Sequence, residues 1–266
     1  MQMYILAIET TGPLGSVAIT DGAGNCSLKI SGEEMNHLKD LMPMAQQLMD
    51  EWKLAKSDLS AVAASIGPGS FTGIRIGVST ARAVAQALNL PAISVPTLDM
   101  FKQRCDGMSL IVPIFNARRG QVYGGVFDEA GDDILQSGPY LLTEVFEAVE
   151  AHLEDVRSEM PCGMLQAASV KFYGDGVDAY AQELADFKEK MLKLEGCRVL
   201  NAPKDERYQD AGMTARAAVK KYRNGELISA DQLLPDYMRV TEAEQKLKDG
   251  SLARERAAKM ARFKAR

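Results

Sequence analysis

The order of strand-like and helical segments constrains this 266-residue chain more than any other feature. Near the N-terminus, short β-prone runs are separated by glycine, proline and aspartate, which favour turns, so they predict a meander of three strands. A helix, a strand, a second helix, a further strand and a short helix follow. The predicted strands are 4–8, 16–20, 25–30, 62–66 and 91–95, and the predicted helices are 33–52, 73–88 and 98–105. In the dinucleotide-binding α/β fold the first strand leads through a glycine loop into a helix. In this chain the first strand leads into a second strand, which argues against that fold.

The same order of elements recurs in the rest of the chain. The predicted strands there are 110–115, 121–127, 134–142, 170–173 and 197–200, and the predicted helices are 143–153, 177–194 and 214–222. A chain of this length is close to the useful limit of a single core, so two lobes are expected. We therefore predict an α/β protein with two βββαβα halves, at 1–106 and 107–245, and a C-terminal tail at 246–266. Residues 157–168 match no pattern.

The most specific motif is a glycine segment, which reads SIGPGSFTGIRIG over residues 65–77. It is not a nucleotide-binding P-loop, because no lysine follows its last glycine. Gly73, Gly77 and Ala81 fall four apart, on one face of the predicted helix, where another backbone can approach closely. The segment thus indicates tight packing rather than catalysis.

The glycine segment resembles the signature of the TsaB (YeaZ) family. Four other pieces of the chain agree with that family in order and spacing: IETT at 8–11 with GSVAI at 15–19, His37 with LMP at 41–43, ARR at 117–119 with VY at 122–123, and PDYMR at 235–239, which resembles the closing strand of the family. The resemblance covers about residues 3–245. It implies an actin-like, hexokinase-like ATPase fold built from two ribonuclease-H-like halves, in agreement with the repeat of elements.

The resemblance also implies a function. Such proteins are the non-catalytic partner of TsaD, and with TsaD and TsaE they support transfer of a threonylcarbamoyl group to adenosine 37 of ANN-decoding tRNAs. ATP and magnesium are used by the assembled complex, whereas this chain is expected to require no cofactor. The catalytic paralogue carries a His-x-x-x-His pair after the strand at 91–95, where this chain has Thr97 and Phe101. Neither side chain can replace imidazole as a metal ligand, so the resemblance implies no catalytic residue and no metal site.

Other functions stay open at the level of the sequence. The chain could be an orphan enzyme of the glycopeptidase and actin-like superfamily, either a peptidase or a small-molecule kinase, or a freestanding nucleotide-binding switch. Glu9, Thr10 and Thr11 stand where actin-like ATPases meet nucleotide phosphates and magnesium, because hydroxyls and a carboxylate at a turn can order an ion. The alternative is that these three residues simply form the turn.

The helix predicted at 33–52 has an apolar stripe that covers about half its circumference, against roughly 100° for an ordinary surface helix. We predict that this stripe and the small residues of the next helix pair with TsaD, or with a second copy of this chain when TsaD is absent. The predicted interface residues are Met35, Leu38, Leu41, Met42, Ala45, Met49, Trp52, Gly73, Gly77 and Ala81. The alternative is a helix buried within its own lobe.

Charge and hydropathy complete the picture. Residues 251–266 contain six basic side chains and one acidic one, so the tail carries +5 and the preceding 250 residues carry −10 of the net −5. Contact with tRNA is therefore expected through the complex and this basic tail. The four cysteines are widely spaced and only two histidines occur, so the sequence predicts neither a zinc site nor a set of disulfides. No apolar run reaches the roughly 20 residues of a membrane helix, and no secretion signal is evident, so we expect a cytoplasmic protein.

Overall fold

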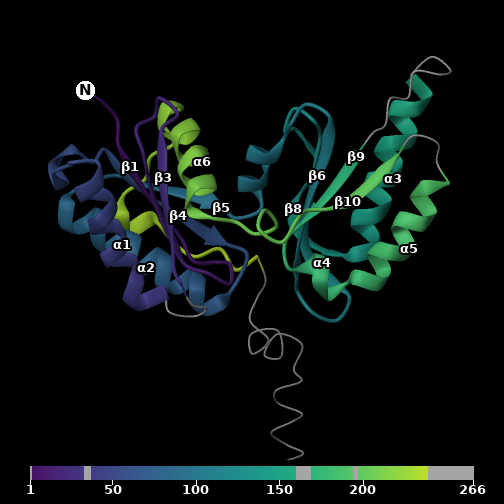
Figure 1. Ribbon diagram of the computed structural model, residues 1–266, viewed down its shortest axis with the longest axis horizontal. Coiled ribbons are helices and arrows are strands. Elements are labelled where there is room, and N and C mark those ends of the chain that lie inside the picture. The colour runs from purple at the N-terminus through teal and green to yellow at the C-terminus, as the bar shows by residue number, and fades with distance from the viewer. Residues whose placement is uncertain (1, 33–36, 160–168, 194–196, 239–266) are drawn as a thin grey trace, which may run out of the picture. The chain divides into compact units, whose positions relative to one another are not determined.

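A computed structural model describes residues 2–32, 37–159, 169–193 and 197–238 of the chain (Figure 1). The residues up to Asp236 group into one compact unit. Within that unit two five-stranded sheets share one strand order, in which the third, second, first, fourth and fifth strands of each half lie side by side. This repeated order is that of the actin-like ATPase fold expected from the sequence.

The first sheet has the order β3-β2-β1-β4-β5. Its strands are β1 (Ile5–Glu9), β2 (Ser16–Thr20), β3 (Cys26–Ile30), β4 (Ala61–Gly67) and β5 (Ala92–Pro96), and the helical elements between them are α1 (His37–Glu51), the 3-10 turn η1 (Lys56–Asp58) and α2 (Phe71–Leu88). The meander β1–β2–β3 is antiparallel, whereas β4 and β5 run parallel to β1. Residues of β1, β2 and β4 are almost entirely buried, because helices cover both faces of the sheet.

The second sheet repeats this arrangement in the order β8-β7-β6-β9-β10. Its elements are the 3-10 helix η2 (Asp99–Arg104), which precedes it, then β6 (Ser109–Asn116), β7 (Gln121–Phe127), β8 (Asp133–Leu141), α3 (Leu142–Glu159), β9 (Ser169–Tyr173), α4 (Gly176–Ala179), α5 (Ala181–Leu192) and β10 (Arg198–Asn201). Helices α3 and α5 lie beside each other (Figure 1), and the Phe146 and Phe187 rings stack at 4.2 Å between them. Phe172 on β9 meets both rings edge-on, so an aromatic cluster joins the helices to the sheet.

The last helix corrects one prediction. We assigned the helix at 214–222 to the second half, but α6 (Ala211–Arg223) packs on the first sheet, against β1 and β2 (Figure 1). The chain thus returns to the first half after β10, and the 3-10 turn η3 (Ala230–Gln232) also contacts α2 there. Asp210 caps α6 by accepting a hydrogen bond from Met213 N, and Ala211 N donates to Ser16 Oγ at 2.9 Å.

Two further predictions differ from the structure. The helix predicted over 177–194 is broken into α4 and α5 at Tyr180, whose backbone is not helical and whose hydroxyl donates to Gln121 O at 2.9 Å. The closing strand predicted at 235–239 is not a strand over its described residues, although Asp236 N donates to Ile66 O at 2.8 Å. Residues 160–168, most of the stretch that matched no pattern, lie outside the described residues.

No helix in the described part of the chain combines the length and apolar character needed to cross a bilayer.

Candidate functional site

The turn after β1 is built from Glu9, Thr10 and Thr11, all of which are buried. One carboxylate oxygen of Glu9, Oε1, accepts hydrogen bonds from the Thr11 backbone N at 2.5 Å and from the Thr11 hydroxyl at 2.6 Å. The Thr10 hydroxyl donates to Gly73 O at 2.7 Å. Thr11 thus bonds to Glu9 Oε1 and Thr10 bonds to the start of α2, so these groups do not point together at a shared ligand position.

Glu9 carries an unusual buried carboxyl group. In the parallel pairing of β1 with β4, Ile8 lies opposite Ala64, so Glu9 follows beside Ser65. Burial raises the pKa of Glu9, and hydrogen bonding from Ser65 and Thr11 only partly offsets that rise. Nevertheless, neither Glu9 Oε2 nor Ser65 Oγ has a partner of full hydrogen-bond geometry among the described residues. The protonated carboxyl group is thus favoured by this site more than by water.

The glycine segment packs against this turn. A Cβ atom at Gly73 or Gly77 would overlap the Thr10 carbonyl oxygen or hydroxyl, and one at Gly69 would lie 2.6 Å from Thr11 O. Ser70 caps α2 by accepting a hydrogen bond from Gly73 N at 3.2 Å. The close approach predicted for this helical face is present, but the approaching backbone is the β1 turn of the same chain. The prediction that a partner helix approaches these glycines is therefore wrong, because Thr10 of the same chain already fills the space beside them.

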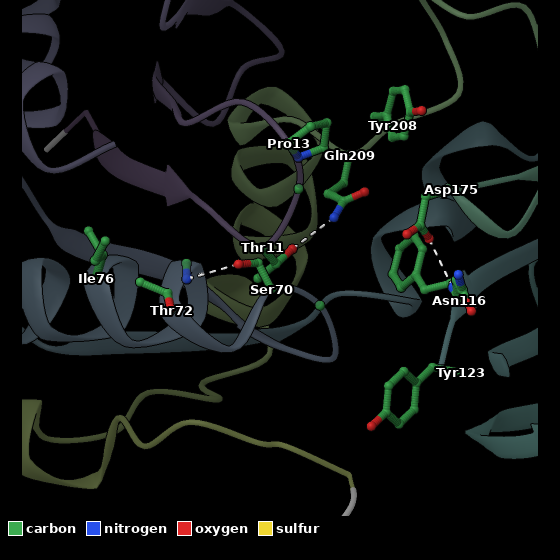
Figure 2. A pocket seen from close by; sticks show the side chains of 14 residues that line it. Thr11, Pro13, Ser70, Thr72, Ile76, Asn116, Tyr123, Asp175, Tyr208 and Gln209 are labelled. Atoms are coloured by element: carbon green, nitrogen blue, oxygen red, sulfur yellow. Dashed lines mark hydrogen bonds between the residues drawn. The ribbon is translucent and has the colours of Figure 1, made fainter. Parts of the chain in front are cut away.

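A cavity of about 450 Å³ lies beside the turn and the start of α2 (Figure 2). Gln209 anchors one side, because its Nε2 donates to Thr11 Oγ1 at 2.9 Å. Gln209 and Arg207 lie in the segment between β10 and α6, which crosses from the second sheet back to the first and is called the crossing segment. Arg207 holds this segment in place, since it donates to Ala202 O and pairs with Asp178 at 2.7 Å. The lining residues are Thr11, Gly12, Pro13, Gly69, Ser70, Thr72, Gly73, Ile76, Phe115, Asn116, Tyr123, Asp175, Tyr208 and Gln209.

The second half contributes a carboxylate to the cavity. Asp175 Oδ1 accepts a hydrogen bond from Asn116 N at 3.0 Å, across from the side that Thr11 and Gln209 form (Figure 2). The side chain is open to the cavity but crowded by protein elsewhere, and this crowding raises the pKa of Asp175. Neither residue is among the predicted site residues: Asp175 lies between two glycines at a strand-to-helix junction, and Gln209 has no signal in the sequence.

Comparisons with known proteins agree over most of the chain. Residues 33–247 match the family described as "TsaD: tRNA N6-adenosine threonylcarbamoyltransferase". A curated relative named "tRNA threonylcarbamoyladenosine biosynthesis protein TsaB", from Bacillus subtilis (strain 168), is 29% identical over 247 residues, which are 92% of this chain and 97% of the relative. The chain belongs to the TsaB (YeaZ) family, within this wider TsaD family.

Two other relatives refine that placement. The TsaB protein of Escherichia coli (strain K12) is 36% identical over 135 residues, which cover 48% of this chain and 58% of that relative. The solved structure "YeaZ from Pseudomonas aeruginosa" superposes with a TM-score of 0.64 at 24% identity, over 88% of this chain and 99% of that chain. The sequence comparisons thus support membership in the TsaB family, and the structural comparison supports the fold.

The fold raises the question of a nucleotide, and the cavity residues do not fit one. None of the described residues that line the cavity is lysine, arginine or histidine, whereas the Asp175 carboxylate would repel phosphate. Of the three residues predicted to meet phosphates and magnesium, only Thr11 lines the cavity, and its hydroxyl is engaged by Glu9 and Gln209.

The two positions predicted to replace the histidine pair lie in the interior. Thr97 is fully buried, and its hydroxyl oxygen accepts a hydrogen bond from Gly67 N at 3.2 Å. Phe101 is also fully buried, with its ring 5.9 Å from Phe115 and 5.5 Å from Tyr173. Thr97 is thus engaged within the first half and Phe101 packs against rings of the second half, and neither offers a ligand atom to an open site.

The predicted interface residues are mostly internal. Leu41, Ala45, Met49, Gly73, Gly77 and Ala81 are buried within the chain. Trp52 is half-buried and donates from Nε1 to Ser27 Oγ at 2.9 Å. Met42 is 49% exposed, whereas Met35 and the side chain of Leu38 lie outside what the structure describes. We predicted that the apolar stripe of the first helix is wider than its own lobe can cover. For the buried residues this prediction is wrong, because the first sheet and neighbouring helices of the same chain cover them.

Proposed function

We propose that this chain is the non-catalytic partner subunit of a tRNA-modifying complex. In this role it pairs with TsaD, and with TsaE in the assembled complex, and it supports transfer of a threonylcarbamoyl group to adenosine 37 of ANN-decoding tRNAs. The complex uses ATP and magnesium for this reaction. The names of the curated relatives, which refer to biosynthesis of threonylcarbamoyladenosine in tRNA, support the pathway.

The observation that carries the scaffold role is the pair of buried side chains after β5. Where the resemblance leads us to expect two metal-binding histidines in the catalytic paralogue, Thr97 and Phe101 are fully buried and engaged in packing. A threonine hydroxyl and a phenyl ring cannot supply the imidazole ligands. A chain that belongs to the family but has this interior is suited to support a catalytic partner rather than to replace it.

The helices of the first half offer the surface for that partner. Met42 on α1 is 49% exposed, and Phe71 at the start of α2 is 44% exposed with the Arg75 guanidinium 4.0 Å from its ring centre. Exposed methionine and aromatic side chains with arginine are typical of the core of a protein interface. We propose that TsaD covers Met42 and Phe71, and that a second copy of this chain does so when TsaD is absent.

The experiment is co-purification of TsaD with Met42→Glu. A charge at a desolvated contact would cost several kcal/mol, so Met42→Glu is expected to reduce TsaD binding at least about tenfold. Met108→Glu is the matched control, because Met108 is 72% exposed and lies in the loop before β6, far along the chain from α1. Equal loss of TsaD from both variants, or from neither, would place the contact elsewhere.

The basic tail adds a second, separable proposal. Residues 251–266 lie outside the described part of the chain, and their net charge of +5 supports contact with tRNA phosphates in the assembled complex. Removing 251–266 should therefore reduce the salt dependence of tRNA binding by the complex while TsaD binding stays unchanged. An unchanged salt slope would contradict this role.

A further inference from the structure

The cavity beside the β1 turn has a composition that points away from nucleotides. Its volume of about 450 Å³ falls within the range of small-molecule sites. Apolar and aromatic side chains form much of the wall, including Ile76, Phe115 and Tyr123. Among the described residues that line it, the charge is a single carboxylate, that of Asp175, with no cationic side chain to balance it.

Asp175 has no cationic partner among the described residues. Its described hydrogen bonds come from backbone N–H groups, including Asn116 N, and the charged group that acts on it is another carboxylate, Asp178. Asp178 is itself paired with Arg207, whose guanidinium is buried and turned to Ala202 O. The cavity therefore presents a carboxylate that no cationic side chain of the described residues pairs.

The opposite side of the cavity presents a hydrogen-bond acceptor that lacks a donor among the described residues. Gln209 is 7% exposed, and its amide nitrogen is used by Thr11. Its amide oxygen is buried with no hydrogen-bond partner among the described residues. Figure 2 shows that oxygen directed away from Thr11, toward the side of the cavity that Asp175 forms. A buried acceptor without a donor is costly, so the site favours a ligand that brings N–H groups.

We propose that this cavity binds a small organic ammonium ion with an aromatic or apolar body. The ammonium group donates to the Asp175 carboxylate and toward the Gln209 amide oxygen, while the body packs against Phe115 and Tyr123. Aromatic faces attract cations as well as apolar groups, so the wall suits both parts of such a ligand. This site adjoins Phe71 of the surface proposed for TsaD, because Ser70 and Thr72 line the cavity, but it does not depend on the tRNA-modifying function.

The test uses 2-phenylethylamine as the cationic probe and 2-phenylethanol as its neutral counterpart of similar size. Calorimetry and saturation-transfer NMR on the full chain should show roughly millimolar binding of the amine, as expected for so few heavy atoms. The alcohol should bind at least about tenfold more weakly, because it lacks the charge-assisted hydrogen bond to the carboxylate. ADP with magnesium should not compete with the amine.

Two variants and one control connect the binding to the site. Asp175→Asn keeps an oxygen for Asn116 N but removes the charge, so amine affinity should fall to that of the alcohol. Tyr123→Leu should weaken amine and alcohol alike through loss of the aromatic wall. Asp205→Asn removes an exposed carboxylate outside the cavity and should leave amine affinity unchanged. Thermal unfolding of each variant reports whether the fold is intact.

Several results would overturn the proposal. These are no amine binding in the millimolar range, equal affinity for amine and alcohol, or amine affinity that a folded Asp175→Asn variant retains. Displacement of the amine by ADP would instead identify a phosphate site that happens to accept the probe. If Asp175→Asn does not fold, folded Tyr123→Leu decides the location, because unchanged affinity for both probes would place their binding outside this cavity.

Discussion

At Gly73, α2 packs so closely on the β1 turn that no space remains for a side chain. A Cβ atom there would overlap the Thr10 carbonyl oxygen and would also lie 3.0 Å from the carbonyl carbon. The obstacle is backbone in a buried turn rather than the end of a flexible side chain, so relief requires movement of β1 against α2. Gly73→Ala is therefore expected to destabilise the protein, although alanine is the better helix former.

The magnitude follows from opposing contributions. Overpacking of a rigid site costs roughly 1–3 kcal/mol, and the Thr10 hydroxyl bond to Gly73 O, if displaced, adds about 1 kcal/mol. Replacing glycine in a helix returns about 0.5–1 kcal/mol. The net loss in free energy of unfolding is thus about 1–3 kcal/mol, which corresponds to a fall in Tm of roughly 2–10 °C for a protein of this size.

Urea unfolding and thermal unfolding of Gly73→Ala measure this loss directly. The matched control is Gly32→Ala, where an added Cβ meets no atom of the described residues within 4 Å and stability should change by about 0.5 kcal/mol or less. If Gly73→Ala is as stable as the parent but loses TsaD, then the glycine face admits a partner helix after all. That result would refute the assignment of the close approach to Thr10.

Three further predictions concern buried groups. Folding raises the pKa of Glu9, so its contribution to stability is present below the ordinary carboxyl pKa of 4.5 and is lost as the pH rises through the higher folded value. Glu9→Gln should therefore remove this pH dependence from the free energy of unfolding measured in urea. An unchanged pH profile would contradict this. Met49→Glu buries a carboxylate at a position only 6% exposed, so it should cost several kcal/mol in urea unfolding, and a loss below about 1 kcal/mol would show that the helix face is open. Arg207→Met removes the donors to Ala202 O and the pair with Asp178, so thermal unfolding should show a loss of about 1–3 kcal/mol, whereas a neutral result would mean that the crossing segment does not need them.

Much of the fold could be predicted because its signals are local. Each strand of the first meander is a short β-prone run closed by turn residues, and β1, β2 and β3 lie within one residue of their predicted limits. Ser70 directly precedes the helix after the glycine segment, and its side chain caps that helix. Strand propensity, turn residues and capping depend on neighbouring residues, which the sequence displays directly.

What could not be predicted depends on contacts between distant parts of the chain. The amphipathic pattern of α6 requires an apolar surface but does not say which sheet supplies it, and the structure places it on the first. The break at Tyr180 coincides with a hydrogen bond from its hydroxyl to Gln121 O, 59 residues away. Gln209 reaches Thr11 across 198 residues, so no local pattern could have assigned it to the cavity.

The measurement that tests the central proposal most directly is tRNA modification in a reconstituted system. TsaD, TsaE and the enzyme that forms threonylcarbamoyl-adenylate are combined with an ANN-decoding tRNA, ATP and magnesium, with and without this chain, and modified adenosine 37 is quantified by mass spectrometry. We expect modification only when the chain is present, a strong reduction with Met42→Glu, and parent activity with Met108→Glu. Full modification without the chain, or modification by the chain in the absence of TsaD, would contradict the role of a non-catalytic partner.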